Sequence, residues 1–330
     1  MGRAEQSKPT YVHSPTVIGT IPIGDERQFP ESPLIVCREE VVQVQAQRSA
    51  ISGLLIVILL AGSERMSGQK LPLEPAHEWG QSVTGAFEGW FANEDGSYSL
   101  LLGYYNRNTK QELDIPLGPH NRIEPGEPDQ GQPTHFLTGR QWGVFTMIVP
   151  KDFGNRKLTW TLVANGQTTV IPMSLNPLWE VSPFIEGNGN TPPFISFEEG
   201  KRGVQGPRES STTLTTKLPD PLTLTVWVAD DLKLPRSASQ GVRNVPVTVG
   251  WGKFRGPGVV TFAENRPTVE KIASTVRPPM AFSGKASTTA TFSEPGEYVL
   301  RVVANDASGD GGRGFQCCWS NAQVKVSVNR

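Results

Sequence analysis

The last third of the chain carries the feature that most constrains its fold, the recurrence of apolar side chains at every second position. In residues 298–305 and again in residues 322–328, every second side chain is apolar. A period of two is typical of β-strands that turn one face toward a core and the other face away from it. Pro295-Gly296, just before the first segment, marks a turn. We therefore predict that the chain ends in a small antiparallel β-sandwich.

Composition extends this prediction to the rest of the chain. The 330 residues are enough for two ordinary domains, and they include 34 Gly and 28 Pro. A composition rich in turn formers, with short apolar runs, favours an all-β protein. The formal net charge is -1, so no strong field attracts nucleic acid. We predict an all-β fold of two antiparallel β-sandwich domains, without a nucleic-acid partner.

One long apolar run, residues 51–62, points to export. Arg48 precedes it, and Ala61-Gly-Ser63 closes it with small residues. As a helix the run rises about 18 Å, well short of the roughly 30 Å of a membrane's hydrocarbon core. Its length, basic flank and small-residue exit are typical of the hydrophobic region of a signal peptide, and a retained membrane anchor is the alternative. Residues 49–63 are therefore predicted to be a signal peptide or anchor.

The exported protein is then periplasmic, cell-surface or secreted, and it meets a membrane only through residues 51–62 if these are not cleaved. Residues 1–48 are Pro-rich and polar, without clear periodicity. They are either a disordered tail or the result of a start codon assigned too far upstream. Neither interpretation predicts a folded segment there.

The first block of strands spans residues 72–182. Asn165-Gly166 supplies the two positive-φ positions that a two-residue hairpin needs. Residues 118–132 are rich in Pro, Gly and charge, and they predict a long loop at one rim of this domain. Strands are expected at residues 83–91, 98–105, 141–149, 157–163 and 168–173.

Residues 183–216 separate this block from the second one. Their prolines stiffen the chain locally, whereas Gly and Ser loosen the rest, so we interpret them as a Pro/Gly-rich linker. The second block spans residues 217–329. Strands are expected there at residues 222–228, 245–251, 259–262, 288–292, 298–305 and 322–328.

The second block resembles a known family. The strings KFRGPGVVTF at residues 253–262, ASTTATFS at residues 286–293 and PGEYVL at residues 295–300 look like a bacterial immunoglobulin-like domain of the polycystic-kidney-disease (PKD) type. The Trp-Asp-Phe-Gly-Asp-Gly signature of typical members is absent, and VGWG at residues 249–252 stands near its place. The resemblance covers about residues 218–328.

This resemblance implies an immunoglobulin-like β-sandwich, usually a spacer or adhesive module of exported proteins, and it implies no catalysis. Tyr298 is placed for the strand-corner tyrosine whose hydroxyl bonds back to the main chain in such sandwiches. By analogy we expect the first domain to be a sandwich too, although the resemblance does not reach it.

Aspartates near two predicted strand ends suggest a calcium site. Asp306 and Asp310 flank a Gly-rich turn, and Asp230 ends another strand that can reach the same rim. Calcium takes six to eight oxygen ligands, and glycine lets backbone carbonyls fold around the ion. A solvated turn rich in Asp and Gly is the alternative. No other cofactor is predicted.

Cys317 and Cys318 are the only cysteines after the apolar run, because Cys37 precedes it. In an oxidising compartment they can close a vicinal disulfide, pair between chains, or stay reduced in a core. A vicinal disulfide beside Trp319 can form a rigid apolar platform for a ligand. The sequence leaves these alternatives open.

Aromatic side chains in the first domain suggest a glycan surface. Tyr104 and Tyr105 are adjacent in a predicted strand, so their side chains point to opposite faces. At least one of them is expected to be exposed, where its ring can stack on a sugar. Together with Trp319 they are the candidate ligand-binding residues.

An enzyme is the alternative in another class. His120 and Glu124 lie in the loop, with His135 just beyond it, and a general acid–base pair can form there. No zinc-ligand spacing and no Gly-x-Ser-x-Gly motif is present. A cluster of His120, His135 and carboxylates in space would favour the enzyme, whereas an exposed aromatic strip would favour binding.

We therefore predict an exported, non-catalytic adhesion, scaffold or glycan-binding protein of the cell envelope, with a glycan or an envelope protein as partner. The alternative is a secreted hydrolase or metal-dependent enzyme with its site in residues 118–135.

Overall fold

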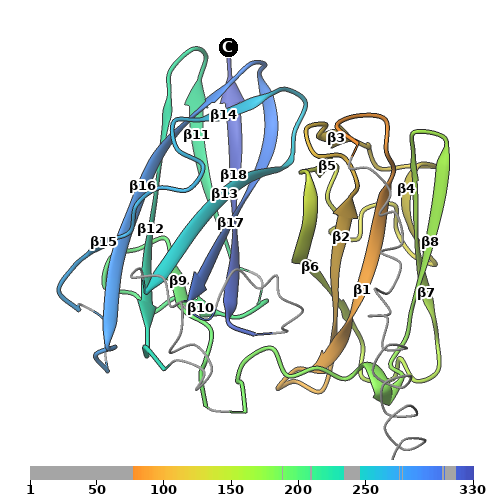
Figure 1. Ribbon diagram of the computed structural model, residues 1–330, viewed down its shortest axis with the longest axis horizontal. Helices are drawn as coiled ribbons and strands as arrows, with labels where there is room; N and C mark the ends of the chain where they lie inside the picture. Colours follow the sequence, from red (N-terminus) through yellow and green to blue (C-terminus); the bar gives the residue numbers. More distant parts are fainter. Residues whose placement is uncertain are drawn as a thin grey trace, which may run out of the picture. The chain divides into compact units, whose positions relative to one another are not determined.

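The protein is all-β in the part that the structure describes (Figure 1), which confirms the predicted fold class. This computed structural model describes residues 77–187, 189–208, 210–233, 246–274, 276, 278–306, 308 and 317–330. They belong to one compact unit, residues 74–330. The segments predicted at residues 1–48 and 49–63 lie outside the described residues. Of the described part, no helix has the length and apolar character needed to cross a membrane.

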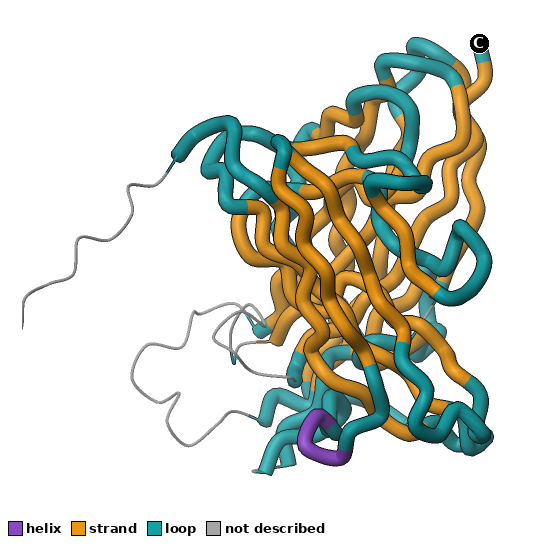
Figure 2. Tube along the Cα trace, turned by 90° about the vertical axis from the view of Figure 1, so that its right-hand side faces the viewer, coloured by secondary structure: helices purple, strands orange, loops and turns teal. Residues whose placement is uncertain are grey.

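The first sandwich is built from short antiparallel sheets around one core. One sheet has the order β1 (Val83–Ala92), β2 (Tyr98–Asn106) and β6 (Gly139–Val149), and a second has the order β4 (Asn121–Glu124), β7 (Leu158–Ala164) and β8 (Gln167–Met173). A two-stranded sheet joins β3 (Leu113–Asp114) to β5 (His135–Phe136). Figure 2 shows the short 3-10 turn at Pro177–Trp179 (purple) at the lower end of these strands.

Local signals explain the strand pairs of this sandwich. The β7–β8 hairpin turns at Asn165 (φ 48°) and Gly166 (φ 76°), as predicted. Trp160 is fully buried in the core, and its indole N–H donates to Oδ1 of Asn121 at 3.0 Å. Asn121 in turn donates to the carbonyls of Ile115 (2.9 Å) and Pro133 (2.7 Å). This buried amide holds the two ends of the long loop against the core.

The second sandwich has two larger sheets. One has the order β11 (Ser211–Lys217), β18 (Trp319–Asn329), β17 (Gly296–Asp306) and β13 (Val247–Arg255). The other has the order β10 (Val204–Gln205), β9 (Phe194–Ser196), β12 (Leu222–Asp230), β16 (Phe282–Phe292) and β14 (Val260–Phe262), and β15 (Glu270–Lys271) also pairs with β16. In immunoglobulin nomenclature the first sheet contains the equivalents of strands G (β18), F (β17) and C (β13). The other sheet contains those of strands A (β9), B (β12), E (β16) and D (β14). The strand order is therefore that of an immunoglobulin-like sandwich.

The predicted alternation builds the core of this sandwich. Tyr298, Leu300, Val302 and Ala304 are each exposed by 1% or less. Burial of one such large apolar side chain contributes about 1.5–3 kcal/mol. The hydroxyl of Tyr298 donates to the carbonyl of Glu294 at 2.8 Å, which is the corner bond that the sequence predicted.

The segment at residues 183–216 differs from the predicted linker. It carries β9, β10 and most of β11, and all three strands pair within the second sandwich. β9 pairs with β12, and β11 runs parallel to β18 from Ser211 opposite Gln323 to Lys217 opposite Asn329. Thr212, Leu214 and Thr216 form the half-buried face of β11, and only Leu214 is apolar, so the strand carries no clear apolar alternation. Composition alone therefore suggested a loop where long-range pairing makes strands.

The two sandwiches contact each other directly. Phe254, at the end of β13, packs into the core of the first sandwich, and its carbonyl accepts from the backbone N–H of Thr134 at 3.2 Å. The guanidinium of Arg255 donates two hydrogen bonds of 2.8 Å to the carboxylate of Asp129 and one of 2.9 Å to the carbonyl of Gln132. Bidentate pairs of this kind fix orientation as well as distance.

Candidate functional site

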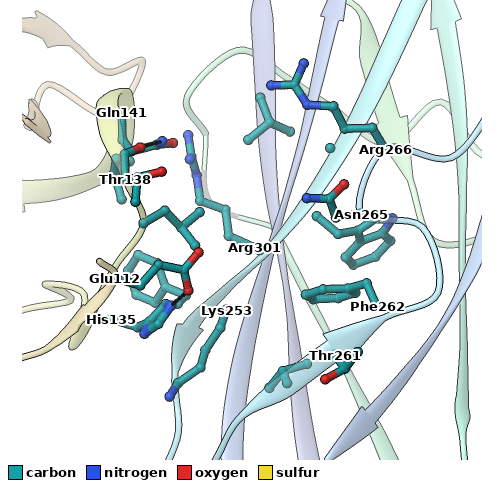
Figure 3. A pocket seen from close by; sticks show the side chains of 18 of the residues that line it. Glu112, His135, Thr138, Gln141, Lys253, Thr261, Phe262, Asn265, Arg266 and Arg301 are labelled. Atoms are coloured by element: carbon teal, nitrogen blue, oxygen red, sulfur yellow. Dashed lines mark hydrogen bonds and ion pairs between the residues drawn. The ribbon is translucent and has the colours of Figure 1, made fainter. Parts of the chain in front are cut away.

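A cleft of about 1040 Å³ lies between the two sandwiches (Figure 3). Its floor is the outer face of β13 and β17, where Gly250 pairs with Val303 and Gly252 with Arg301. Successive side chains of a strand point to opposite faces, so the neighbours of these residues fill the core beneath. Gly250 places no side chain on the floor and has open space above it, whereas a β-carbon at Gly252 would lie 2.8 Å from Cδ1 of Leu137, so this glycine allows the first wall to approach the floor. Glycine inside a strand often marks such a place.

Polar groups line both walls of the cleft. The wall from the first sandwich consists of Tyr104, Glu112, Asp114, His135, Leu137, Thr138, Gln141 and Val144. The opposite wall is residues 259–266, which return to the edge of β13 where the backbone N–H of Trp251 donates to the carbonyl of Asn265 at 2.7 Å. Thr261, Glu264 and Asn265 are exposed on this wall. The cleft therefore offers hydroxyl, amide and charged groups from two sides.

Arg301 is the charged group of the floor. Its Nη2 donates to the carbonyls of Trp142 (3.0 Å) and Gly143 (3.2 Å) and to Oδ1 of Asn321 (2.9 Å). Its Nε is buried and has no hydrogen-bond partner among the described residues. Burial lowers the pKa of Arg301 to about 10, and the nearby Glu88 only partly offsets this. The guanidinium stays charged at neutral pH.

His135 is held between two carboxylates on the first wall. Its Nδ1 lies 2.9 Å from Oδ1 of Asp114, and its Nε2 lies 3.0 Å from Oε2 of Glu112. The Nζ of Lys253 lies 3.0 Å from the same oxygen of Asp114 and donates to the carbonyl of Gly258 at 2.9 Å. Burial of the imidazole opposes its charge, but the hydrogen bonds to Asp114 and Glu112 outweigh this, so the pKa of His135 is raised.

Both ring nitrogens of His135 lie within hydrogen-bond distance of a carboxylate oxygen, and the raised pKa favours the charged form, in which both N–H groups donate to these oxygens. A general base needs a ring nitrogen with a free lone pair, which the charged form lacks. The cluster can orient and charge the wall, but it presents no base to a substrate.

The loop predicted for the enzyme alternative has other roles. The side chain of His120 is exposed and does not line the cleft, and its carbonyl accepts from the backbone N–H of Val163 at 2.9 Å. Asn121 is buried in the core contacts described above, and Arg122 pairs with Glu124 at the surface at 2.8 Å. Of the two histidines expected to converge with carboxylates, the structure brings only His135 to them.

The candidate ligand-binding aromatics separate in space. Tyr104 is 2% exposed, and its hydroxyl, at the cleft wall, accepts from the backbone N–H of Leu137 at 2.8 Å. Tyr105 is 45% exposed on the opposite face and does not line the cleft. Trp319 is buried against Gly143 of the first sandwich. The rings that do line the cleft with Tyr104 are those of Trp251, Phe254 and Phe262.

Asp230 and Asp306 are both buried, at the ends of β12 and β17. Asp306 accepts from Nδ2 of Asn190 and from the backbone N–H of Ser308, each at 2.8 Å. Burial, together with the charges of Asp306 and Asp231, raises the pKa of Asp230 to about 7. Asp310 lies outside the described residues. Within those residues no group of three or more His, Cys, Asp or Glu side chains could hold a metal ion, and the calcium site stays a prediction.

A disulfide joins Cys317 to Cys318, which is one of the three alternatives that the sequence left open. Both cysteines are buried, and the carbonyl of Cys318 accepts from the backbone N–H of Asp306 at 3.2 Å. Cys318 has a φ of 152°, so the backbone is not in a regular strand conformation just before β18 begins. The indole of Trp319 that follows is covered by the first sandwich, so this apolar platform faces protein and not solvent.

Sequence reasoning missed the groups that define the cleft, namely Glu112, Asp114, Lys253 and Arg301. Two signals were available. Gly250 and Gly252 interrupt a predicted strand, which indicates close approach or open space. Arg301 stands among valines on the outward face of a strand, where a cation needs a polar neighbour.

Comparisons with known proteins add little to this geometry. No family model and no curated protein matches the chain. Solved structures with some likeness include a titin fragment (10% identity, 74% of this chain and 99% of that chain, TM-score 0.22) and the D00-D0 domain of intimin (14%, 74% and 99%, TM-score 0.20). A third is CfaE, the adhesive subunit of the CFA/I fimbria of enterotoxigenic Escherichia coli (8%, 79% and 82%, TM-score 0.22). At such low TM-scores we take neither a fold nor a function from these matches.

Proposed function

We propose that the protein is an exported, non-catalytic binding protein of the cell envelope that holds an oligosaccharide in the cleft between its two sandwiches. The observation that carries this proposal is the cleft itself, with about 1040 Å³ of space above a floor that Gly250 leaves open. Ligand sites in proteins are usually concave and combine apolar surface with a few placed polar groups.

The lining suits a sugar chain. Gln141 and Asn265 offer amides that both donate and accept, and Thr138 and Thr261 offer hydroxyls. Sugar hydroxyls also donate and accept, so these groups can satisfy them from both walls. The ring of Phe262 supplies an apolar surface on which a sugar face can pack.

Other observations support the proposal that the protein is exported and non-catalytic. Both ring nitrogens of His135 are occupied, which disfavours acid–base chemistry in the cleft. The strand order of the second sandwich suits a spacer or adhesive module, and membership in the PKD-type family remains a prediction. Export rests on the sequence of residues 49–63.

A glycan array probed with the purified protein tests the proposal, alongside a screen for hydrolysis of the glycans that bind. We expect Phe262→Ala and Asn265→Ala to weaken binding at least about tenfold, which corresponds to about 1.4 kcal/mol. Tyr105→Ala is the matched control, because that ring is exposed but does not line the cleft. Binding that depends on Tyr105 and not on the cleft variants would reject the cleft as the site, and turnover of a bound glycan would reject the non-catalytic function.

A further inference from the structure

Arg301 differs from the other buried or half-buried cations near the cleft in lacking an acidic partner. Lys253 and His135 both contact the carboxylate of Asp114. Arg140, in the adjoining wall, pairs with Glu88 at 2.6 Å. For Arg301 the structure shows, among the described residues, only neutral oxygen acceptors.

The contacts of Arg301 hold its guanidinium in place without neutralising it. Its Nη2 is anchored on the carbonyls of Trp142 and Gly143 and on the amide of Asn321, while its buried Nε has no partner. Glu88, the nearby carboxylate, is already bonded to Arg140 and to the backbone N–H of Gly143 at 2.7 Å. Glu88 therefore offsets only part of the Arg301 charge, and a half-buried charge that is incompletely paired is unfavourable unless a further anion completes the pairing.

We infer that the ligand of the cleft carries a carboxylate that pairs with Arg301, so that the proposed oligosaccharide is an acidic one containing uronic acid units. This inference rests on the proposed function. A guanidinium matches a carboxylate in geometry and charge better than any neutral group does. In Figure 3 the head of Arg301 lies toward Thr138 and Gln141, whose side chains are placed to bond neighbouring sugar hydroxyls.

The charges on the walls largely balance one another. Glu112 and Asp114 are bonded to His135 and Lys253, and Glu264 shares the opposite wall with Arg266. A single carboxylate therefore suffices for the cation of the floor. A glycan in which uronic acid alternates with a neutral sugar brings one carboxylate to Arg301 and hydroxyls to the walls.

Calorimetry with the full-length protein tests this inference with two probes. One is a tetrasaccharide in which glucuronic acid alternates with N-acetylglucosamine, and the other is the same tetrasaccharide with its carboxyl groups reduced to alcohols. We expect the acidic probe to bind at least tenfold more tightly, and we expect Arg301→Gln to abolish that preference. Arg301→Lys should keep part of the preference, because it retains the charge but loses the paired donors.

The outcomes separate the inference from the proposed function. Equal affinity for both probes would overturn the role of Arg301 and leave a glycan-binding cleft standing. Binding of neither probe, together with no binding on the glycan array, would overturn both. Arg301-dependent binding of a glutamate-rich peptide instead of the tetrasaccharide would reject the acidic glycan.

Arg301 also links the sandwiches, so Arg301→Gln can fail to fold, and thermal unfolding of the variant shows whether it has. If the variant does not fold, the salt dependence of binding by the native protein tests the inference instead. Affinity for the acidic probe should fall as salt rises from 20 to about 300 mM while affinity for the reduced probe stays constant. The same salt dependence for both probes would overturn the inference.

Discussion

Trp319 packs against Gly143 so closely that a β-carbon at position 143 would overlap its indole ring. Gly143 has a φ of +49°, its N–H donates to Glu88, and its carbonyl accepts from Arg301. The ring of Trp319 is 3% exposed and follows directly on the Cys317–Cys318 disulfide. One glycine in the first sandwich thus receives an aromatic ring and a guanidinium from the second.

Replacing this glycine should destabilise the protein through the contact between its sandwiches. We expect Gly143→Ala to lower the free energy of unfolding by about 2–4 kcal/mol, because overpacking adds to the strain of a positive φ. Urea unfolding measures this. Gly139→Ala is the matched control, since Gly139 lies in the same strand with a φ of +73° and open space around it. We expect it to lose only about 1 kcal/mol, and equal losses in the two variants would show that the ring contact contributes nothing.

The described part of the chain should unfold in a single transition, because Phe254 of the second sandwich is part of the core of the first. We expect Phe254→Ala to cost about 3–5 kcal/mol and to shift the whole transition. A fragment of residues 217–330 lacks β9 and β10 and nearly all of β11, and it should not fold cooperatively. Calorimetry with two separate transitions in the intact protein would contradict this coupling.

The His135 cluster should make stability depend on pH in a defined direction. The folded pKa of His135 is raised above its ordinary 6.5 by Asp114 and Glu112, against the effect of burial. The folded state therefore binds the proton more tightly, and its stabilisation is complete below about pH 6.5 and is lost as pH rises through the folded pKa. Urea unfolding from pH 6 to 9 should show this decline, and His135→Gln should flatten it. An unchanged slope in the variant would assign the decline to another group.

Ionisation of Asp230 should destabilise the folded protein, whereas ionisation of an ordinary paired carboxylate stabilises it. Burial raises its pKa from 3.8 to about 7, so its ionisation destabilises the folded protein progressively as pH rises over that range. In EDTA at pH 8, urea unfolding should show Asp230→Asn to be more stable than the native protein by up to about 4 kcal/mol, given about 1.4 kcal/mol per pKa unit. At pH 4 the two should be alike. Asp152→Asn is the control, since Asp152 pairs with Arg156 at the surface at 3.2 Å. A variant less stable than the native protein at pH 8 would show that the Asp230 charge is favourable.

The predicted calcium site can be tested by thermal unfolding of the protein with and without the ion. If Asp230, Asp306 and Asp310 bind calcium, the ion should raise the melting temperature, and a hundredfold excess over Kd corresponds to about 2.7 kcal/mol. Asp306→Asn should remove most of this gain. Magnesium is the control, because it is smaller and demands octahedral geometry. No shift with calcium up to 10 mM would reject the site.

Much of the fold was predictable because its signals are local. The alternation at residues 298–305 placed Tyr298 and Leu300 in the core, and Asn165-Gly166 placed a hairpin, since both depend on backbone geometry over a few residues. The opposite orientations of Tyr104 and Tyr105 follow from the same pleat. The sequence alone therefore determined the fold class and most long strands.

Tertiary structure decided the rest, because it depends on pairings across long separations. β11 is a strand only because β18 lies beside it, more than 100 residues later in the chain. The cleft gathers Glu112, His135, Lys253 and Arg301 from four separate strands or loops, and no local pattern links them. Burial then changes the environment of Arg301, since a guanidinium on the outer face of an isolated strand is solvated by water but in the folded protein is covered by Trp142 and Gly143 of the first sandwich.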